Sequence, residues 1–230
     1  MISKEPVGFI DPDLIPWRPE AGIDGLFAKT LSSCESTGSY TRLLKFLPGT
    51  DTSSAGVQAH DHLEELWIVE GAIYDLTLES NFVAGMYANR LYHMDHGPWR
   101  APEGAITYEL RDFDTARQIT KDQLEFMDPD LVEWDGSDSE AGVFVKTLTQ
   151  CEETGSYGRL VKFHPGATQP DSLSGSVDRS ELCVVSGLLH NRGDGSIHQE
   201  GTYGNLYVDL LDGNWSSPGG CVVLEVRNLI

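Results

Sequence analysis

The stretch CESTGSYTRLLKFLPG, residues 34–49, is repeated almost unchanged as CEETGSYGRLVKFHPG, residues 151–166. Within each copy apolar and polar residues alternate, as in TRLLKF (41–46), and the run ends in a Pro-Gly turn. Alternation with a period of two is typical of a half-buried β-strand, and Pro-Gly is typical of the turn that follows one. The chain is therefore predicted to contain two copies of one strand-based unit.

The repeat extends well beyond this stretch. Upstream, DPDLIPW (11–17) returns as DPDLVEW (128–134) in the same register. Self-similarity over about a hundred residues indicates two whole structural units rather than a shared motif. We therefore expect two like domains, residues 1–118 and 119–230.

Each copy carries further short alternating stretches, such as LWIV (66–69) and ITYEL (106–110), separated by turn sequences such as APEG (101–104). No long stretch has the 3.6-residue period of an amphipathic helix. Several short strands at this spacing favour a sandwich or a small barrel. The predicted fold class is all-β.

The composition excludes several functions. The 230 residues include 36 acidic and 16 basic side chains, a formal net charge of −20. Such a surface is repelled by phosphate backbones and anionic lipid, so we expect neither nucleic acid nor membrane as a partner. The N-terminus lacks the pattern of a signal peptide and the apolar runs are strand-sized, so we expect a cytoplasmic protein. The four cysteines show no metal-type spacing.

The strongest chemical signal is HDHLE, residues 60–64. On a regular strand His60, His62 and Glu64 would point to the same face, because side chains alternate sides. Two imidazoles and a carboxylate suit a divalent transition metal such as iron, manganese, zinc or nickel. An H-x-H on an exposed strand is, however, often only solvated, so the context of the motif matters.

That context resembles the two cupin motifs. HDHLE followed by Gly71 is similar to the first motif, and GMYANRLYHMDHGPW (85–99) is similar to the second, in which His96 completes the ligand set. The resemblance is strongest to the ChrR-like cupins, which include an acetylacetone-cleaving dioxygenase and the cupin domain of the anti-sigma factor ChrR. It rests on matches over most of both repeats, at Trp17, 25–31, 47–49, Glu64, Glu65, Gly71, Gly85, Tyr87 and 96–98. It implies tandem double-stranded β-helix domains of the cupin or jelly-roll type, that is, a bicupin.

Two departures from the family pattern leave alternatives open. Only Leu63 separates His62 from Glu64, where cupins usually have three or four residues, so Glu65 is a second choice of ligand. The turn before His96 is YHMD rather than Pro-Pro-Gly-Ser, so His93 is an alternative ligand or a hydrogen-bonding neighbour of the site.

The second copy lacks all of the predicted ligands. Aligning the repeats places four non-imidazole residues opposite His60, His62, Glu64 and His96, in that order Ser176, Asp178, Ser180 and Asp212. We therefore expect residues 1–118 to form a metal-binding cupin and 119–230 a degenerate cupin without metal.

The resemblance implies an Fe(II)-dependent dioxygenase that uses O2 to cleave a carbon–carbon bond of a small dicarbonyl or ketone substrate. His60, His62 and His96 would hold the iron, and Glu64 would bind it or act as a base. The substrate pocket would be lined by Leu66, Ile68 and Trp99.

Two other functions suit the same ligands. One is a metal-binding regulatory or sensor cupin related to ChrR, and the other is a metal-dependent isomerase or lyase, since fold does not fix function. The second cupin could replace a partner subunit or only stabilise the first, and a homodimer of the whole chain remains open.

Overall fold

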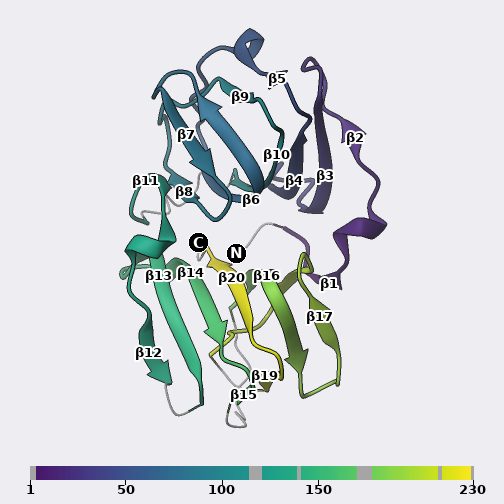
Figure 1. Ribbon diagram of the computed structural model, residues 1–230, viewed down its shortest axis with the longest axis vertical. Helices are drawn as coiled ribbons and strands as arrows, with labels where there is room; N and C mark the ends of the chain where they lie inside the picture. The colour runs from purple at the N-terminus through teal and green to yellow at the C-terminus, as the bar shows by residue number, and fades with distance from the viewer. Residues whose placement is uncertain (1–3, 114–120, 139–140, 170–177, 212–213, 229–230) are drawn as a thin grey trace. The chain divides into compact units, whose positions relative to one another are not determined.

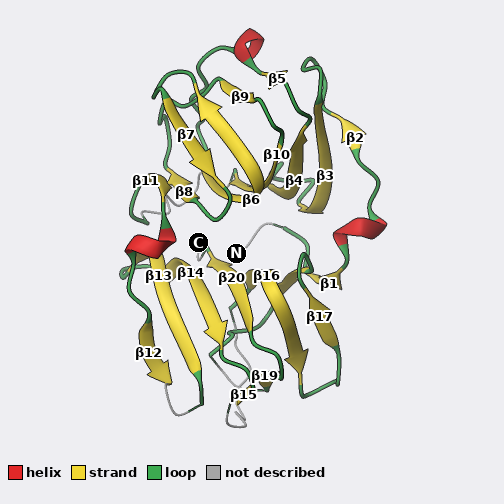
Figure 2. Cartoon of the chain, in the orientation of Figure 1, coloured by secondary structure: helices red, strands yellow, loops and turns green. Residues whose placement is uncertain are grey.

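The alternating stretches form strands in the computed structural model, which describes residues 4–113, 121–138, 141–169, 178–211 and 214–228 (Figure 1). The helices among these residues are single 3-10 turns at Pro12–Leu14, Ser53–Ala55 and Pro129–Leu131 (Figure 2). None of them is long and apolar enough to cross a membrane. The all-β prediction is confirmed.

The chain divides into two compact units. The first unit is Asp13–Pro129, and the second unit combines Met1–Pro12 with Asp130–Ile230. The predicted boundary between residues 118 and 119 differs from this division at both ends, because two segments pair with the other repeat.

The first unit is a ten-stranded antiparallel structure with the order β11-β8-β6-β10-β4-β3-β2, while β5, β7 and β9 form a smaller sheet that shares β6. Its strands are β2 (Arg18–Pro19), β3 (Leu26–Ser33), β4 (Tyr40–Phe46), β5 (Thr50–Asp51), β6 (Leu63–Asp75), β7 (Ser80–Val83), β8 (Tyr87–Arg90), β9 (Trp99–Ala101), β10 (Ala105–Asp112) and β11 (Leu124–Met127).

The second unit repeats this topology as β1-β18-β16-β20-β14-β13-β12, with β15, β17 and β19 beside β16. Its strands are β1 (Val7–Ile10), β12 (Asp135–Asp138), β13 (Val143–Cys151), β14 (Ser156–Phe163), β15 (Ala167–Thr168), β16 (Ser180–Asn191), β17 (Ile197–Gln199), β18 (Tyr203–Leu206), β19 (Trp215–Ser217) and β20 (Cys221–Arg227).

Strands β1 and β11 occupy equivalent edges but are exchanged between the repeats. β1 pairs with β18 and β11 pairs with β8, both antiparallel. A buried lysine precedes each strand: Lys4 contacts Glu181 and Lys121 contacts Glu65, each at 2.5 Å. These ion pairs, buried within each unit, explain why the segments belong to these sheets and why the division differs from the repeat boundary.

Strand β6 joins the two sheets of the first unit. Its first part pairs with β8 and β10, and its last four residues pair with β7. The change of direction occurs at Gly71, which has a φ of 72° and where a Cβ would lie 2.2 Å from the carbonyl oxygen of Gly104. Only glycine fits this bend. The core packed around it contains Leu26, Leu44, Phe46, Ile68, Ile73 and Phe82.

Candidate metal centre

The predicted ligands come from two segments of the first unit. His60 and His62 lie in the turn before β6, and Glu64 is the second residue of that strand. His96 is held between β8 and β9 by two backbone hydrogen bonds with Gln58, both 2.9 Å. Because β6 begins only at Leu63, the alternation of a regular strand does not govern His60 and His62.

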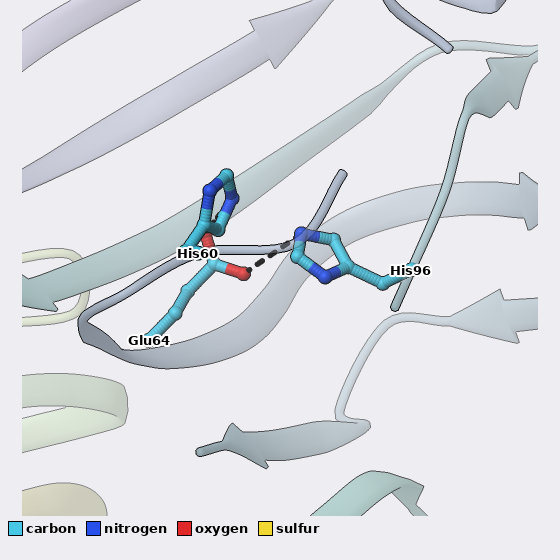
Figure 3. A group of neighbouring side chains, drawn as sticks. All are labelled: His60, Glu64 and His96. Carbon is cyan, nitrogen blue, oxygen red and sulfur yellow. Dashed lines mark ion pairs between the residues drawn. The ribbon is translucent and has the colours of Figure 1, made fainter. Parts of the chain in front are cut away.

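Three of the four predicted ligands converge. Figure 3 shows the side chains of His60, Glu64 and His96 turned toward one another, and their ligand atoms lie within 4.8 Å of each other. His96 Nε2 is 3.4 Å from Glu64 Oε2, and His60 Nε2 is 3.9 Å from Glu64 Oε1. His62 lies outside this group: its ring stacks on that of His60, with centroids 4.5 Å apart, and against Phe113.

Burial disfavours the protonation of all three imidazoles. Burial lowers the pKa of His60 to about 4 and also lowers the pKa of His62 and of His96. Nε2 of His60 is buried without a hydrogen-bond partner. Nδ1 of His96 lies 2.9 Å from the Met94 carbonyl oxygen, which can only accept, so Nε2 carries the lone pair that faces Glu64. Neutral imidazoles with unsatisfied nitrogens beside an ionised carboxylate fit a divalent transition metal.

Arginines keep Glu64 ionised. Arg90 Nη1 and Arg111 Nη2 each lie 2.8 Å from its carboxylate. Although burial opposes ionisation, Arg111 and Arg90 hold the pKa of Glu64 well below its usual value. Hydrogen bonds of this kind orient metal-binding carboxylates in many proteins. Arg111 also contacts Glu109 at 2.7 Å, and Arg42 pairs with Glu109 from the other side.

The converging side chains open onto a cavity of about 240 Å³. Of the predicted pocket residues, Leu66 and Trp99 line it, whereas Ile68 is fully buried in the neighbouring core. The other apolar part of the wall is Ile23, Leu26, Leu44, Phe46 and Ile73. The charged part is Glu20, Arg42, Glu64, Arg90, Glu109 and Arg111.

The two alternative residues lie elsewhere. Glu65 points away from the cluster of His60, Glu64 and His96, as the parity of β6 requires, and binds Lys121 and the hydroxyl of Tyr87. The side chain of His93 is exposed, and its φ is 63°. Its backbone N–H donates to the His60 carbonyl oxygen at 2.6 Å, so His93 positions the ligand turn through its main chain.

In the second unit, two of the four replaced positions, Ser176 and Asp212, lie outside the described residues. At the position of Glu64, Ser180 Oγ accepts a hydrogen bond of 3.0 Å from Arg227 Nε. Asp178 is half-buried and its carboxylate lies 4.0 Å from Arg227. An arginine thus contacts a neutral hydroxyl where the first unit has a buried carboxylate.

Sequence reasoning missed most of the polar cavity wall, including two residues that differ between the repeats. Arg90 on β8 and Thr107 on β10 both line the cavity and are almost fully buried. The repeat alignment contained a signal for both residues, because Leu206 and Val223 lie opposite them. The other charged residues of the wall are identical in the second copy: Arg42, Glu109 and Arg111 correspond to Arg159, Glu225 and Arg227.

Comparison with known proteins establishes the fold class. No family model and no curated protein matches the sequence. A proposed dioxygenase from Nostoc punctiforme has a similar structure, with a TM-score of 0.72 and 14% identity over 99% of this chain and 83% of that one. A cupin 2 conserved barrel domain protein from Leptotrichia buccalis matches with a TM-score of 0.63 and 11% identity, over 97% and 98% of the two chains.

Oxalate decarboxylase from Bacillus subtilis, a protein with Mn(II) centres, matches with a TM-score of 0.60 and 14% identity over 97% of this chain and 77% of its own. Sequence identities this low show a shared fold and nothing about a shared function. The chain therefore has the tandem cupin fold that the repeats and the resemblance to the cupin motifs together predicted. The narrower assignment to the ChrR-like branch stays a prediction.

Proposed function

We propose that the first unit is a mononuclear metal-dependent enzyme, an Fe(II) dioxygenase that cleaves a carbon–carbon bond of a small dicarbonyl or ketone substrate. The observation that carries this proposal is the convergence of His60, Glu64 and His96 on a cavity of about 240 Å³. His62, stacked beside His60, is the fourth proposed ligand. Bound Fe(II) would supply a Lewis acid for the substrate oxygens and the redox chemistry with O2.

The residues of the chain have distinct tasks in this proposal. His60 and His96 present neutral nitrogens, because burial disfavours their protonation. Glu64 stays ionised between Arg90 and Arg111, so it can bind the metal or accept a proton from an enolisable substrate. Leu66 and Trp99 form an apolar part of the cavity wall and exclude water from the reacting oxygens.

A redox-neutral isomerase or lyase is the second candidate. The observation that favours it is the position of the Glu64 carboxylate on the cavity wall, because proton abstraction next to a carbonyl needs a base and a Lewis acid but no O2. The two candidates share ligands and differ in whether O2 is consumed.

The experiment is anaerobic purification and loading with Fe(II) or Zn(II), followed by O2-electrode measurements with a panel of β-diketones and aryl ketones. The dioxygenase predicts O2 uptake stoichiometric with substrate in the Fe(II) protein and none in the Zn(II) protein. Product formation without O2 uptake in both forms would establish the second candidate instead. Tight metal binding without turnover of any substrate would favour the regulatory role.

A further inference from the structure

The cavity wall is charged at the end that holds the proposed ligands. Glu64 of β6 lies opposite Arg90 of β8 on one side and opposite Arg111 of β10 on the other. Two residues away on β10, Glu109 lies opposite Arg42 of β4. Paired residues on neighbouring strands point their side chains to the same face of a sheet. These five residues therefore form two adjacent charged rows, and all of them line the cavity.

The other end of the same face is apolar. Along β4 the inward positions after Arg42 are Leu44 and Phe46, and a rise of 3.3 Å per residue places them roughly 7 and 13 Å further on. Phe46 lies opposite Leu26 of β3. Thr107, opposite Leu44, is the polar residue at the boundary. Since these side chains also line the cavity, it extends from a charged end beside the proposed ligands to an apolar end.

The second unit shows that the fold can fill this space. The residues that correspond to Leu26, Leu44 and Phe46 are Val143, Val161 and Phe163. These counterparts are at most 1% exposed, in a core that also contains the fully buried Leu210. In the first unit the three residues are each 6% exposed and line the cavity. The open apolar space thus accompanies the proposed ligands and is not required by the fold.

Ile23 adds to the apolar end from the loop between β2 and β3. It is half-buried and packs against the core that contains Leu26, Leu44 and Phe46. It lines both the cavity and a more open depression on the surface beside it. The second repeat has Glu140 at this position. The repeat with the proposed ligands therefore has the more apolar sequence at this end.

We infer that the substrate carries an aryl group, which occupies the apolar end while the substrate oxygens lie at the metal site. This narrows the substrate class of the proposed function and rests on its metal site. An apolar cavity of about 150 Å³ is enough to bind benzene. The cavity of about 240 Å³ therefore has room for a ring and a small oxygenated head. A charged substituent would lose its hydration among Leu44, Phe46 and Ile73.

The test measures binding of acetylacetone and of benzoylacetone, in which a phenyl ring replaces one methyl group, to the Zn(II)-loaded full chain by calorimetry. Each affinity is divided by the affinity of the same ligand for free Zn(II), so that only the contribution of the protein remains. This corrected affinity should be about 10- to 100-fold higher for benzoylacetone, because the phenyl group is buried. The 4-carboxyphenyl analogue should bind at least about 10-fold more weakly than benzoylacetone, because its carboxylate would be desolvated.

Two variants change the apolar end and leave the proposed ligands and their arginines in place. L44F adds a ring where the aryl group would lie, and I23A removes apolar contact at a half-buried loop position. The preference for benzoylacetone over acetylacetone should fall at least about 10-fold in L44F and about 3-fold in I23A.

The controls make the same substitutions elsewhere. L43F alters the adjacent residue of β4, which points to the opposite face, and I197A alters an exposed residue of β17. Both should keep the wild-type preference. Equal corrected affinities in the wild type, or an unchanged preference in L44F and I23A, would overturn the inference. So would a 4-carboxyphenyl analogue that binds as tightly as benzoylacetone. If L44F fails to fold, I23A decides the question in the same way.

The outcome is separable from that of the proposed function. A preference for benzoylacetone that falls in L44F and I23A, with no O2 uptake by the Fe(II) protein, supports the aryl site and refutes the dioxygenase. O2 uptake with β-diketones by a protein that shows no such preference supports the dioxygenase and refutes the aryl site.

Discussion

Glu64 links the proposed metal ligands to the charged wall of the cavity. Its carboxylate lies near the imidazoles of His60 and His96 on one side and contacts Arg90 and Arg111 on the other. Removing it would leave the buried Arg90 and the half-buried Arg111 short of a partner, and breaking a buried ion pair costs about 3–5 kcal/mol. Loss of metal and loss of stability would therefore coincide in a Glu64 variant. Variants of the histidines can separate the loss of metal from the loss of stability.

We predict that His96→Ala lowers Zn(II) affinity at least about 100-fold, because it removes one of three converging ligands. The matched control is His93→Asn, three residues away: His93 is exposed, and asparagine tolerates its positive φ. It should retain wild-type affinity. Competition with a chromogenic chelator gives both affinities, and thermal melts show whether each variant is folded. Equal loss in the two variants would contradict the assignment of His96 as the ligand.

At the scale of elements, β6 and its neighbours β8 and β10 bring the residues of the site together. The sequence predicts only part of this arrangement. Alternation correctly separates Glu64 from Glu65 onto opposite faces of β6. It does not by itself place His62, whose ring stacks on that of His60, because the strand begins after it and the turn is shaped by contacts such as that from His93 to His60. Periodicity is a local property and carries no information about a turn that distant backbone groups hold.

The repeat alignment could not predict the exchange of β1 and β11, for a related reason. The alignment pairs Lys4 with Lys121 whichever sheet edge each segment joins, since both edges present the same Glu and Tyr. Only the three-dimensional path of the chain decides between them. Arg90 and Thr107, in contrast, were visible in the alignment as polar residues facing Leu206 and Val223.

The exchange predicts which fragment folds. A fragment of residues 13–129 contains β11 and the Lys121–Glu65 ion pair, whereas 1–118 lacks both and carries β1 without its sheet. We expect 13–129 to be more stable by about 3–5 kcal/mol, the cost of breaking a buried ion pair. Urea unfolding followed by circular dichroism measures the difference. Equal stabilities would contradict the exchange, and K121M in 13–129 should remove most of the advantage.

At the scale of the whole molecule, the two repeats share one framework. The bend at Gly71 recurs at Gly187, where a Cβ would lie 2.1 Å from the Gly220 carbonyl oxygen. The arginine and glutamate cluster persists as well, with Arg159 and Glu225 in contact at 2.8 Å. Residues that maintain the barrel are thus shared, whereas the residues proposed to hold a metal have no matching counterparts in the sequence of the second repeat.

This asymmetry predicts one metal ion per chain. Zn(II) titration should saturate at one equivalent and, at a free concentration of 100 times Kd, stabilise the site-bearing unit by about 2.7 kcal/mol. The stabilisation should vanish in His96→Ala. It should persist in Ser180→Ala, which alters the position opposite Glu64 and removes the hydroxyl that accepts from Arg227.

Elemental analysis of dialysed protein gives the stoichiometry, and calorimetric unfolding with and without Zn(II) gives the stabilisation. Two equivalents per chain, or loss of the metal effect in Ser180→Ala, would show that the second unit also binds metal, because a serine hydroxyl outside a binding site has no influence on ligand linkage.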